Sequence, residues 1–408
     1  MIKKLCLILC VIIAMSATAG CTGSLLTPGV NAPPDTSKIN QDFTESNSIF
    51  AFNIFRQLNT EDENRNIFIS PLSISTALSM TYMGAGTTTK EAMAKALEYT
   101  GADDEILAEG YRNLIRYLSQ LDNKIELDIS NSLWIREGEQ IKEAFLSGSK
   151  DIFNASINYQ DFSAENAADT INQWISGATK GKIKKLLEPP ISPDVIMYLI
   201  NAIYFKGDWK YKFDEKNTSD ALFNAGNGLA SQVRMMSKKG KAGYMQGEGF
   251  KAVSLPYGSG NTAMYCILPD ENVPVNKFIA DLDESKWREI QSGMAEANEV
   301  EIKLPRFKLE YGVKNLNDSL TALGMGEAFS DQADFSGIRN DICISRVLHK
   351  AVIDVNEEGS EAAAVTGVEM QAVSASEPLS FIADRPFIFI IVDDTTGTIL
   401  FMGKAYNL

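Results

Sequence analysis

The sequence predicts a mixed α+β protein, because helical and strand-like patterns alternate along the chain without forming a regular βαβ series. Apolar residues make up 45% and charged residues 22% of the 408 residues, which is an ordinary globular composition. Strand-like runs return after long gaps, and this spacing favours mixed sheets. Neither a linker nor an internal repeat interrupts residues 41–408. Disorder, a collagen-like fold and a multi-span membrane protein are therefore excluded.

Helices are predicted where apolar residues recur every three or four positions. The first covers the apolar positions from Phe43 to Leu58, and the second opens at Pro71, where the missing proline N–H costs little. Further helices are predicted at 90–98, 104–121, 164–178 and 275–293. Short apolar or alternating runs predict strands at 67–70, 125–135, 195–205, 250–256, 262–268, 299–311, 346–356, 387–393 and 398–403.

The first twenty residues have the pattern of a secretory signal peptide. Lys3 and Lys4 precede an apolar run from Leu5 to Ala14, and small residues then lead to Cys21. This order of charged, apolar and small-residue regions predicts a signal peptide at residues 1–20. The apolar run is too short for a membrane span.

Cys21 resembles the lipidated cysteine of prokaryotic lipoproteins, with Thr18 standing where that motif usually has leucine. Plain secretion without a lipid is the alternative. Residues 21–40 are mainly small and polar with three prolines, which is typical of a flexible tether behind such a cysteine. We therefore expect an exported prokaryotic protein, extracellular or in the cell envelope, with a membrane link only through lipid at Cys21.

Charge and histidine content restrict the chemistry. The chain has 38 Lys and Arg against 53 Asp and Glu, and this net charge of -15 argues against nucleic-acid binding. His349 is the only histidine, so a His-rich zinc site is excluded and most hydrolase mechanisms are left with this one candidate. The glycine-containing stretches at 84–87 and 177–182 lack the spacing of nucleotide-binding loops. The sequence predicts no cofactor, no metal and no nucleic-acid partner.

The cysteines do not establish whether the protein contains a disulfide. Cys6 and Cys10 belong to the predicted signal peptide, which leaves Cys266 and Cys343 in the body of the chain. Both lie in apolar strand-like runs and are predicted to be buried free thiols. A disulfide between them is the alternative in an exported protein.

A segment near the C-terminus is suited to two conformations. From Ser360 onward the charged residues fall on odd positions only, whereas the even positions up to Met370 are small or apolar. Because side chains alternate between the two faces of a strand, this segment can enter a sheet without burying a charge. Its small side chains also suit an exposed loop. A segment able to be loop or strand is the basis of a conformational trap.

These residues resemble the reactive-loop hinge of an inhibitory member of the serpin family. The resemblance covers essentially the whole chain from residue 41. Its motifs are Glu357–Ala364, Asn66–Ile74, Asn201–Trp209, Leu304–Phe307, Leu323–Met325 with Ala333–Ser336, Asp384–Phe387 and Phe401–Lys404. It implies one large α+β domain at 41–408, with three β-sheets, about nine α-helices and a reactive-centre loop at about 358–378.

The resemblance implies an inhibitor of serine peptidases and not an enzyme. The target cleaves the exposed loop and forms a covalent acyl-enzyme, and the loop then inserts as a new strand into the main sheet. We expect a monomer whose partner is a serine peptidase, with cysteine peptidases as a second class. The implied hinge residues are Glu357, Glu358, Gly359, Ser360, Glu361, Ala362, Ala363, Ala364, Val365 and Thr366.

Family spacing places the scissile bond between Val373 and Ser374. Cleavage after Ala372, Ser374 or Ala375 stays open, because the stretch up to Arg385 is about two residues longer than in familiar members. Valine suits the small pockets of elastase-like peptidases, and subtilisin-like or chymotrypsin-like targets are the alternatives. No Lys or Arg lies between Glu357 and Asp384, which argues against trypsin-like targets.

Further residues match the family's shutter and breach, the regions beneath and above the opening sheet. The resemblance places Ser70, Ser73, Asn201 and His349 in a shutter hydrogen-bond cluster and Trp209 at the breach.

The alternative function is a non-inhibitory serpin that acts as an envelope binding or scaffold protein. A third reading, an envelope hydrolase, needs a nucleophile beside His349, and the sequence has no GxSxG motif.

Overall fold

The computed structural model describes residues 36–408 except 123 and 361–378. Its α-helices in this range are α1 Gln41–Glu61, α2 Pro71–Tyr82, α3 Thr87–Ala96, α4 Asp104–Leu118, α5 Glu143–Phe153, α6 Ala167–Ala178, α7 Val275–Ala280, α8 Glu284–Gly293 and α9 Asn317–Leu320. Its strands in this range are β1 Ile67–Ile69, β2 Ile125–Arg136, β3 Ser156–Gln160, β4 Met197–Asp208, β5 Ser219–Asn224, β6 Ala230–Gly247, β7 Phe250–Tyr257, β8 Thr262–Pro269, β9 Ala295–Pro305, β10 Phe307–Glu310, β11 Lys314–Asn315, β12 Leu348–His349, β13 Val352–Val355, β14 Gly359–Ser360, β15 Leu379–Ile382, β16 Phe387–Asp393 and β17 Thr398–Ala405. The predicted α+β class is confirmed, with nine helices and three sheets in the described residues.

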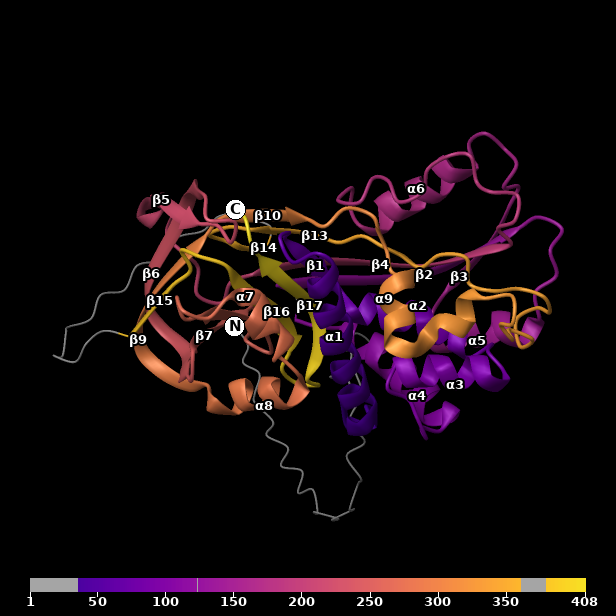
Figure 1. Cartoon of the computed structure of the whole chain (residues 1–408), viewed down its shortest axis with the longest axis horizontal. Coiled ribbons are helices and arrows are strands. Elements are labelled where there is room, and N and C mark those ends of the chain that lie inside the picture. The colour runs from indigo at the N-terminus through magenta and orange to yellow at the C-terminus, as the bar shows by residue number, and fades with distance from the viewer. Residues whose placement is uncertain (1–35, 123, 361–378) are drawn as a thin grey trace, which may run out of the picture. The chain divides into compact units, whose positions relative to one another are not determined.

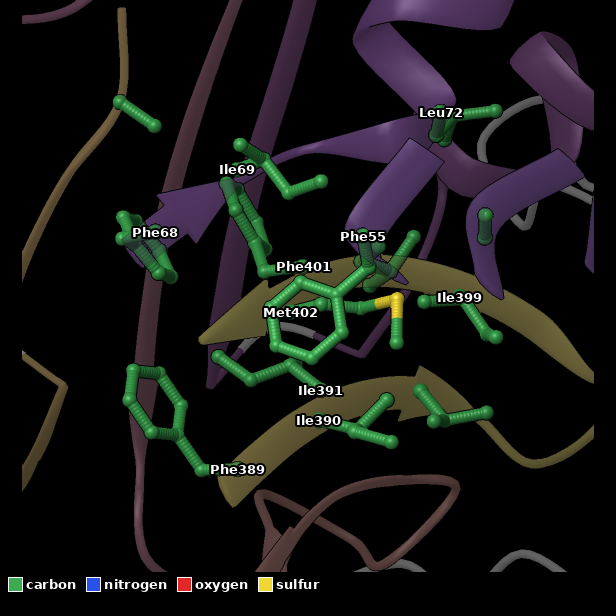
Figure 2. Close-up of a cluster of buried hydrophobic side chains, with 14 of the residues drawn as sticks. Phe55, Phe68, Ile69, Leu72, Phe389, Ile390, Ile391, Ile399, Phe401 and Met402 are labelled. Carbon is green, nitrogen blue, oxygen red and sulfur yellow. The ribbon is translucent and has the colours of Figure 1, made fainter. Parts of the chain in front are cut away.

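The largest sheet forms the centre of the apolar core. Its strands follow the order β1-β17-β16-β8-β7-β6-β9-β15, with β5 added alongside β6. Every residue of β8, β16 and β17 is buried, because these strands have neighbours on both edges and packed faces. Figure 2 shows where β1, β16 and β17 meet helices α1 and α2, with Phe55, Phe68, Phe401 and Met402 in contact.

A six-stranded sheet contains the predicted hinge residues Gly359 and Ser360 and the predicted shutter residue Asn201. Its order is β10-β13-β14-β4-β2-β3, and the long strands β4 and β2 are antiparallel over eleven residue pairs from Ile125 with Gly207 to Ile135 with Met197. Helix α2 packs on one face of β4, and α6 covers the other face of β4 and β2 (Figure 1). Helices therefore lie on both faces of the sheet at β4.

Local sequence signals set where several helices begin. The Asn40 side chain accepts the backbone N–H groups of Asp42 and Phe43, and this cap opens α1. Ser70 caps α2 in the same way, with Pro71 at the first helical position. Asp283 caps α8, so the single helix predicted at 275–293 is in fact two helices, α7 and α8.

Some helices and strands of the structure are not predicted by the sequence patterns. Helix α5 and strands β3, β5 and β6 were not among the predicted elements. The middle of β6 reads Ser-Lys-Lys-Gly-Lys at residues 237–241, a polar run without apolar alternation whose residues are half-buried or exposed. No helix in the described ranges is long and apolar enough to cross a membrane.

Candidate functional site

The hinge residues Gly359 and Ser360 are already part of the six-stranded sheet. As strand β14 they lie between β13 and β4: Ser360 pairs with Val355 on one side and with Gly207 on the other. Among the described residues, β13 and β4 share no pairing with each other. The sheet is therefore parted below Ser360, with the hinge at the top of the opening.

Position 359 requires glycine. Gly359 has a φ of +152°, and a Cβ atom there would lie 2.0 Å from the carbonyl oxygen of Gly207. No side chain can be accommodated at that distance without moving β14 away from β4. The close approach of the two backbones thus depends on this residue type.

Two aromatic residues, Tyr257 and Trp209, make hydrogen bonds to the hinge and to the residue before it. The hydroxyl oxygens of Tyr257 and Ser360 lie 2.7 Å apart and share a hydrogen bond, and both side chains are buried. Trp209 stacks on Tyr257 with ring centroids 4.4 Å apart, and its Nε1 donates to the carbonyl of Asn356. The predicted breach tryptophan therefore contacts the chain just before the hinge.

Two carboxylates fix the preceding residues. Glu357 is buried, and its carboxylate receives a hydrogen bond of 2.6 Å from Thr218 and lies 3.1 Å from Nε of Arg306. Glu358 forms an ion pair with Lys212, which also lies 3.6 Å from Asp208. Burial alone lowers the pKa of Lys212, but hydrogen bonding to Glu358 and the charge of Asp208 raise it overall.

The predicted shutter residues form two groups. In one, the backbone N–H of Ser70 donates to Nε2 of His349 at 3.2 Å, and the Ser70 hydroxyl accepts the N–H of Ser73. In the other, Nδ2 of Asn201 donates to Oδ1 of Asn131 at 2.7 Å. Burial lowers the pKa of His349 to about 4, so its ring is neutral at pH 7. No hydrogen bond links Asn201 to His349 within the described residues.

Two cavities follow the opening in the sheet. A small one of about 30 Å³ lies beside Ser360, between Ile203 of β4 and Ile353 of β13. A larger one of about 740 Å³ continues along β4 and includes both Asn201 and His349 in its lining. The connection between α6 and β4, residues 179–196, contributes Ile183 to the walls of both cavities.

Several predicted site residues lie outside the described residues. These are the hinge residues Glu361, Ala362, Ala363, Ala364, Val365 and Thr366, the bond Val373–Ser374, and Cys21. Of the two remaining cysteines, both are free; Cys266 is buried as predicted, whereas Cys343 is exposed because its segment, 339–347, forms no strand. In the described ranges no group of His, Cys, Asp or Glu side chains could hold a metal ion.

Three residues that contact the hinge were not singled out from the sequence. Tyr257, Thr218 and Lys212 lie more than one hundred residues before Ser360, in unrelated parts of the chain. No local pattern marks them. Arg306 belongs to a motif of the resemblance, but its pairing with Glu357 is visible only in the structure.

The comparisons with known proteins agree on the family. The family model "Serpin (serine protease inhibitor)" matches residues 45–408. A leukocyte elastase inhibitor from Bos taurus is 35% identical over 89% of this chain and 99% of its own length. A serpin-like protein from the archaeon Methanosarcina acetivorans is 36% identical over 89% of this chain and 87% of its own length. The chain belongs to the serpin family and is thus of a class of protease inhibitors, not enzymes.

Solved structures extend this result to the fold. The native state of the thermophilic serpin tengpin superimposes with a TM-score of 0.83 at 32% identity, covering 91% of this chain and 95% of that one. Human thyroxine-binding globulin, in complex with its ligand, gives a TM-score of 0.82 at 30% identity, covering 90% and 98%. The fold is thus shared with a globulin whose name states that it binds thyroxine.

Proposed function

We propose that the protein inhibits serine peptidases as a suicide substrate, by inserting its cleaved loop between β13 and β4. The single observation that carries the proposal is the position of β14. Ser360 pairs with both flanking strands and Gly359 pairs with β4, and this placement at the start of the gap supports the proposal that the loop adds there as a strand. The cavities below Ser360 provide room for the strand to continue.

The reactive bond in this proposal is Val373–Ser374, within a loop at 358–378. Neighbouring bonds after Ala372, Ser374 and Ala375 are the alternatives. A small aliphatic residue before the bond suits an elastase-like peptidase, and the Bos taurus relative named a leukocyte elastase inhibitor supports this class. Subtilisin-like and chymotrypsin-like peptidases are the next targets to test, ahead of cysteine peptidases.

The test is to mix the chain from residue 41 onward with pancreatic elastase, subtilisin and chymotrypsin in separate reactions. We expect a covalent complex that survives denaturing electrophoresis, together with a released peptide that begins at Ser374. Complete cleavage without a covalent complex, and without a rise in the melting temperature of the cleaved protein, would contradict the proposal.

The second candidate is a non-inhibitory serpin that binds a ligand or partner in the cell envelope. The likeness to thyroxine-binding globulin, a ligand-binding protein by its name, favours it. Small side chains in the hinge favour the inhibitor, because Gly359 and Ser360 enter the sheet without a clash. The same mixing experiment separates the two, since a carrier gives cleavage without a trapped complex.

We also propose export by a signal peptide at residues 1–20, followed by lipid attachment at Cys21 and a tether to residue 40. The small residues before Cys21 support the cleavage site. Radiolabelled palmitate should be incorporated into the chain expressed in a bacterium and not into its Cys21→Ser variant. Release of unlabelled wild-type protein into the medium would instead indicate plain secretion.

A further inference from the structure

The larger cavity along β4 has the size and the apolar walls of a small-molecule site. Its volume of about 740 Å³ lies within the range of roughly 300–1,000 Å³ that is typical of such pockets. Helix α2, the connection between α6 and β4, strand β4 and the segment 338–350 all line it. Their apolar contributions include Ile74, Ile183, Leu187, Ile200 and Leu348. These walls favour an apolar ligand, and the charged residues of the lining decide which polar group that ligand carries.

Positive charge gathers at one end of the cavity, around Tyr198. The guanidinium of Arg346 donates a hydrogen bond to the hydroxyl oxygen of Tyr198. The guanidinium of Arg136 donates to the carbonyls of Val195 and Ser192, and its charge also acts on Tyr198. Burial raises the pKa of Tyr198, and the two guanidinium charges oppose this effect. Both charges that act on this hydroxyl are therefore positive.

These two arginines differ from the other cations of the cavity. Arg339 and Lys350 also line it, and each forms an ion pair with a glutamate. Within the described ranges, neither Arg346 nor Arg136 forms an ion pair with a carboxylate. The two aspartates of the lining are exposed, and their charges are not among those that act on Tyr198. A guanidinium without a carboxylate of its own can bind the carboxylate of a ligand.

Tyr198 adds a second donor beside Arg346. Its oxygen accepts from the guanidinium, which leaves its O–H to donate. In the part of the chain that the structure describes, no acceptor for this O–H is found. A carboxylate only accepts hydrogen bonds, and its two oxygens match the two donors of Arg346 and Tyr198. An ammonium group would instead be repelled by the guanidinium charges.

We propose that this cavity binds an apolar molecule that ends in a carboxylate, such as a long-chain fatty acid. The carboxylate binds to Arg346 and Tyr198, and the apolar part lies along β4. The net charge of the protein, -15, disfavours general anion binding, so the affinity comes from this local arrangement and from the apolar walls. The uncleaved protein binds this ligand, so the inference goes beyond the proposed function and does not depend on insertion of the loop.

The test is calorimetric titration of the uncleaved full chain with octanoate, decanoate and dodecanoate. We expect one molecule bound per chain and a dissociation constant that falls about fourfold for each methylene added, because each methylene leaves water for the apolar cavity. The neutral 1-decanol should bind at least about tenfold more weakly than decanoate, because it lacks the charge-assisted hydrogen bonds.

Two variants examine the end group separately from the apolar walls. Arg346→Gln should weaken decanoate binding at least about tenfold and leave 1-decanol binding unchanged. Tyr198→Phe keeps the ring but removes the hydroxyl, and should weaken decanoate binding about fivefold. Arg116→Gln is the matched control, since Arg116 is exposed and lies outside the lining, and it should bind decanoate as the wild type does. Melting curves of the three variants show that each is folded.

Three results would overturn the inference. An absence of saturable binding of dodecanoate by wild-type protein would show that the cavity is not a ligand site. An affinity that does not depend on chain length would place the binding on surface charge and not in the cavity. Equal decanoate binding by wild type and Arg346→Gln would show that the carboxylate does not bind at Arg346. Because no peptidase is present, these results are independent of whether the loop traps its target.

Discussion

The carbonyl oxygen of Gly207 excludes every residue except glycine at position 359. A Cβ atom there would lie 2.0 Å from it, far inside any van der Waals contact. The hydroxyl of the next residue, Ser360, shares a hydrogen bond with that of Tyr257. The two residues before Gly359 form ion pairs, Glu357 with Arg306 and Glu358 with Lys212. Each of four consecutive residues thus has its own constraint at the top of the sheet.

Replacing Gly359 by alanine should remove β14 from the sheet. The clash with Gly207 cannot be relieved by a side-chain movement, so the hinge must shift, and the amide of Gly207 should exchange with solvent at least about tenfold faster. Gly228→Ala is the matched control: it has a φ of +81° but no atom within 4 Å of the added Cβ. Equal exchange in the two variants would contradict the constraint.

Arg306→Gln should destabilise the protein by about 2 kcal/mol, because it leaves the buried carboxylate of Glu357 with Thr218 as its remaining side-chain partner. Lys239→Gln breaks an exposed pair with Glu299 and should cost less than about 0.5 kcal/mol. Urea unfolding measures both. Restoration of stability in the Arg306→Gln, Glu357→Gln double variant would complete the test.

His349 should make stability depend on pH between about 6.5 and 4. Burial lowers its pKa to about 4, so in this window the unfolded chain binds a proton that the folded protein does not. Stability therefore falls as the pH falls through this window, by up to roughly 3 kcal/mol, and the effect is absent above it. Burial raises the pKa of Asp394 to about 6, which gives the opposite slope.

The contribution of His349 is therefore read from the difference between wild-type protein and His349→Gln. Unfolding midpoints in urea at pH 7 and at pH 4.5 provide it: the advantage of the wild type should shrink at the lower pH. Parallel curves for the two proteins would show that the ring does not titrate as expected.

Among the elements, the connection between α6 and β4 is the one that must respond to insertion, because Ile183 lines both cavities along the opening. It is held at one end by Lys180, which forms ion pairs with Glu126 and Asp128 of β2. In the middle of the connection, the side-chain oxygen of Asn172 of α6 accepts the N–H groups of Leu186 and Leu187, and its Nδ2 donates to the carbonyl of Leu187. These contacts keep the connection over the sheet.

Asn172→Ala should release this connection. The variant loses three hydrogen bonds of a buried amide, which predicts a loss of about 2 kcal/mol in unfolding free energy and faster amide exchange at Leu186 and Leu187. Gln173→Ala, at an exposed position of the same helix, is the control. Unchanged exchange at 186–187 in Asn172→Ala would show that other contacts hold the segment.

At the scale of the whole molecule, Lys404 joins distant parts of the chain. Its buried Nζ donates to Oδ1 of Asn59, to the carbonyls of Asp62 and Glu63, and to Oδ1 of Asn276. Strand β17 is thereby connected to α1, to the turn that follows α1, and to α7. The ammonium group has three N–H donors, so these four oxygen atoms share its hydrogen bonds.

Lys404→Met should lower the unfolding free energy by about 3 kcal/mol, since it keeps the apolar stem but leaves the buried oxygens unpaired. Lys277→Met, at an exposed position next to Asn276, should stay within about 0.5 kcal/mol of wild type. Thermal and urea unfolding of both variants measure this difference. Similar losses in the two would indicate a general effect of removing positive charge.

The fold and the position of the hinge segment can be predicted from the sequence. The side-chain contacts that fix the hinge in the sheet cannot. Strands such as 387–393 are continuous apolar runs, and Pro71 and Asn40 mark helix starts within the chain itself. Tyr257 reaches Ser360 only through the sheet, across 103 positions of sequence. Likewise no local pattern encodes that Asn201 bonds to Asn131 while His349 bonds to Ser70, so the predicted shutter residues form two groups.

The length of β4 also sets a distance. Its twelve residues, at about 3.3 Å each, span about 40 Å. Under the proposed mechanism, the cleaved loop inserts alongside β4 over its whole length. A peptidase bonded to the end of the loop is then moved by that distance, from one end of the sheet to the other. About 40 Å is comparable to the diameter of a folded domain of 200 residues, so a trapped peptidase is displaced by roughly its own width.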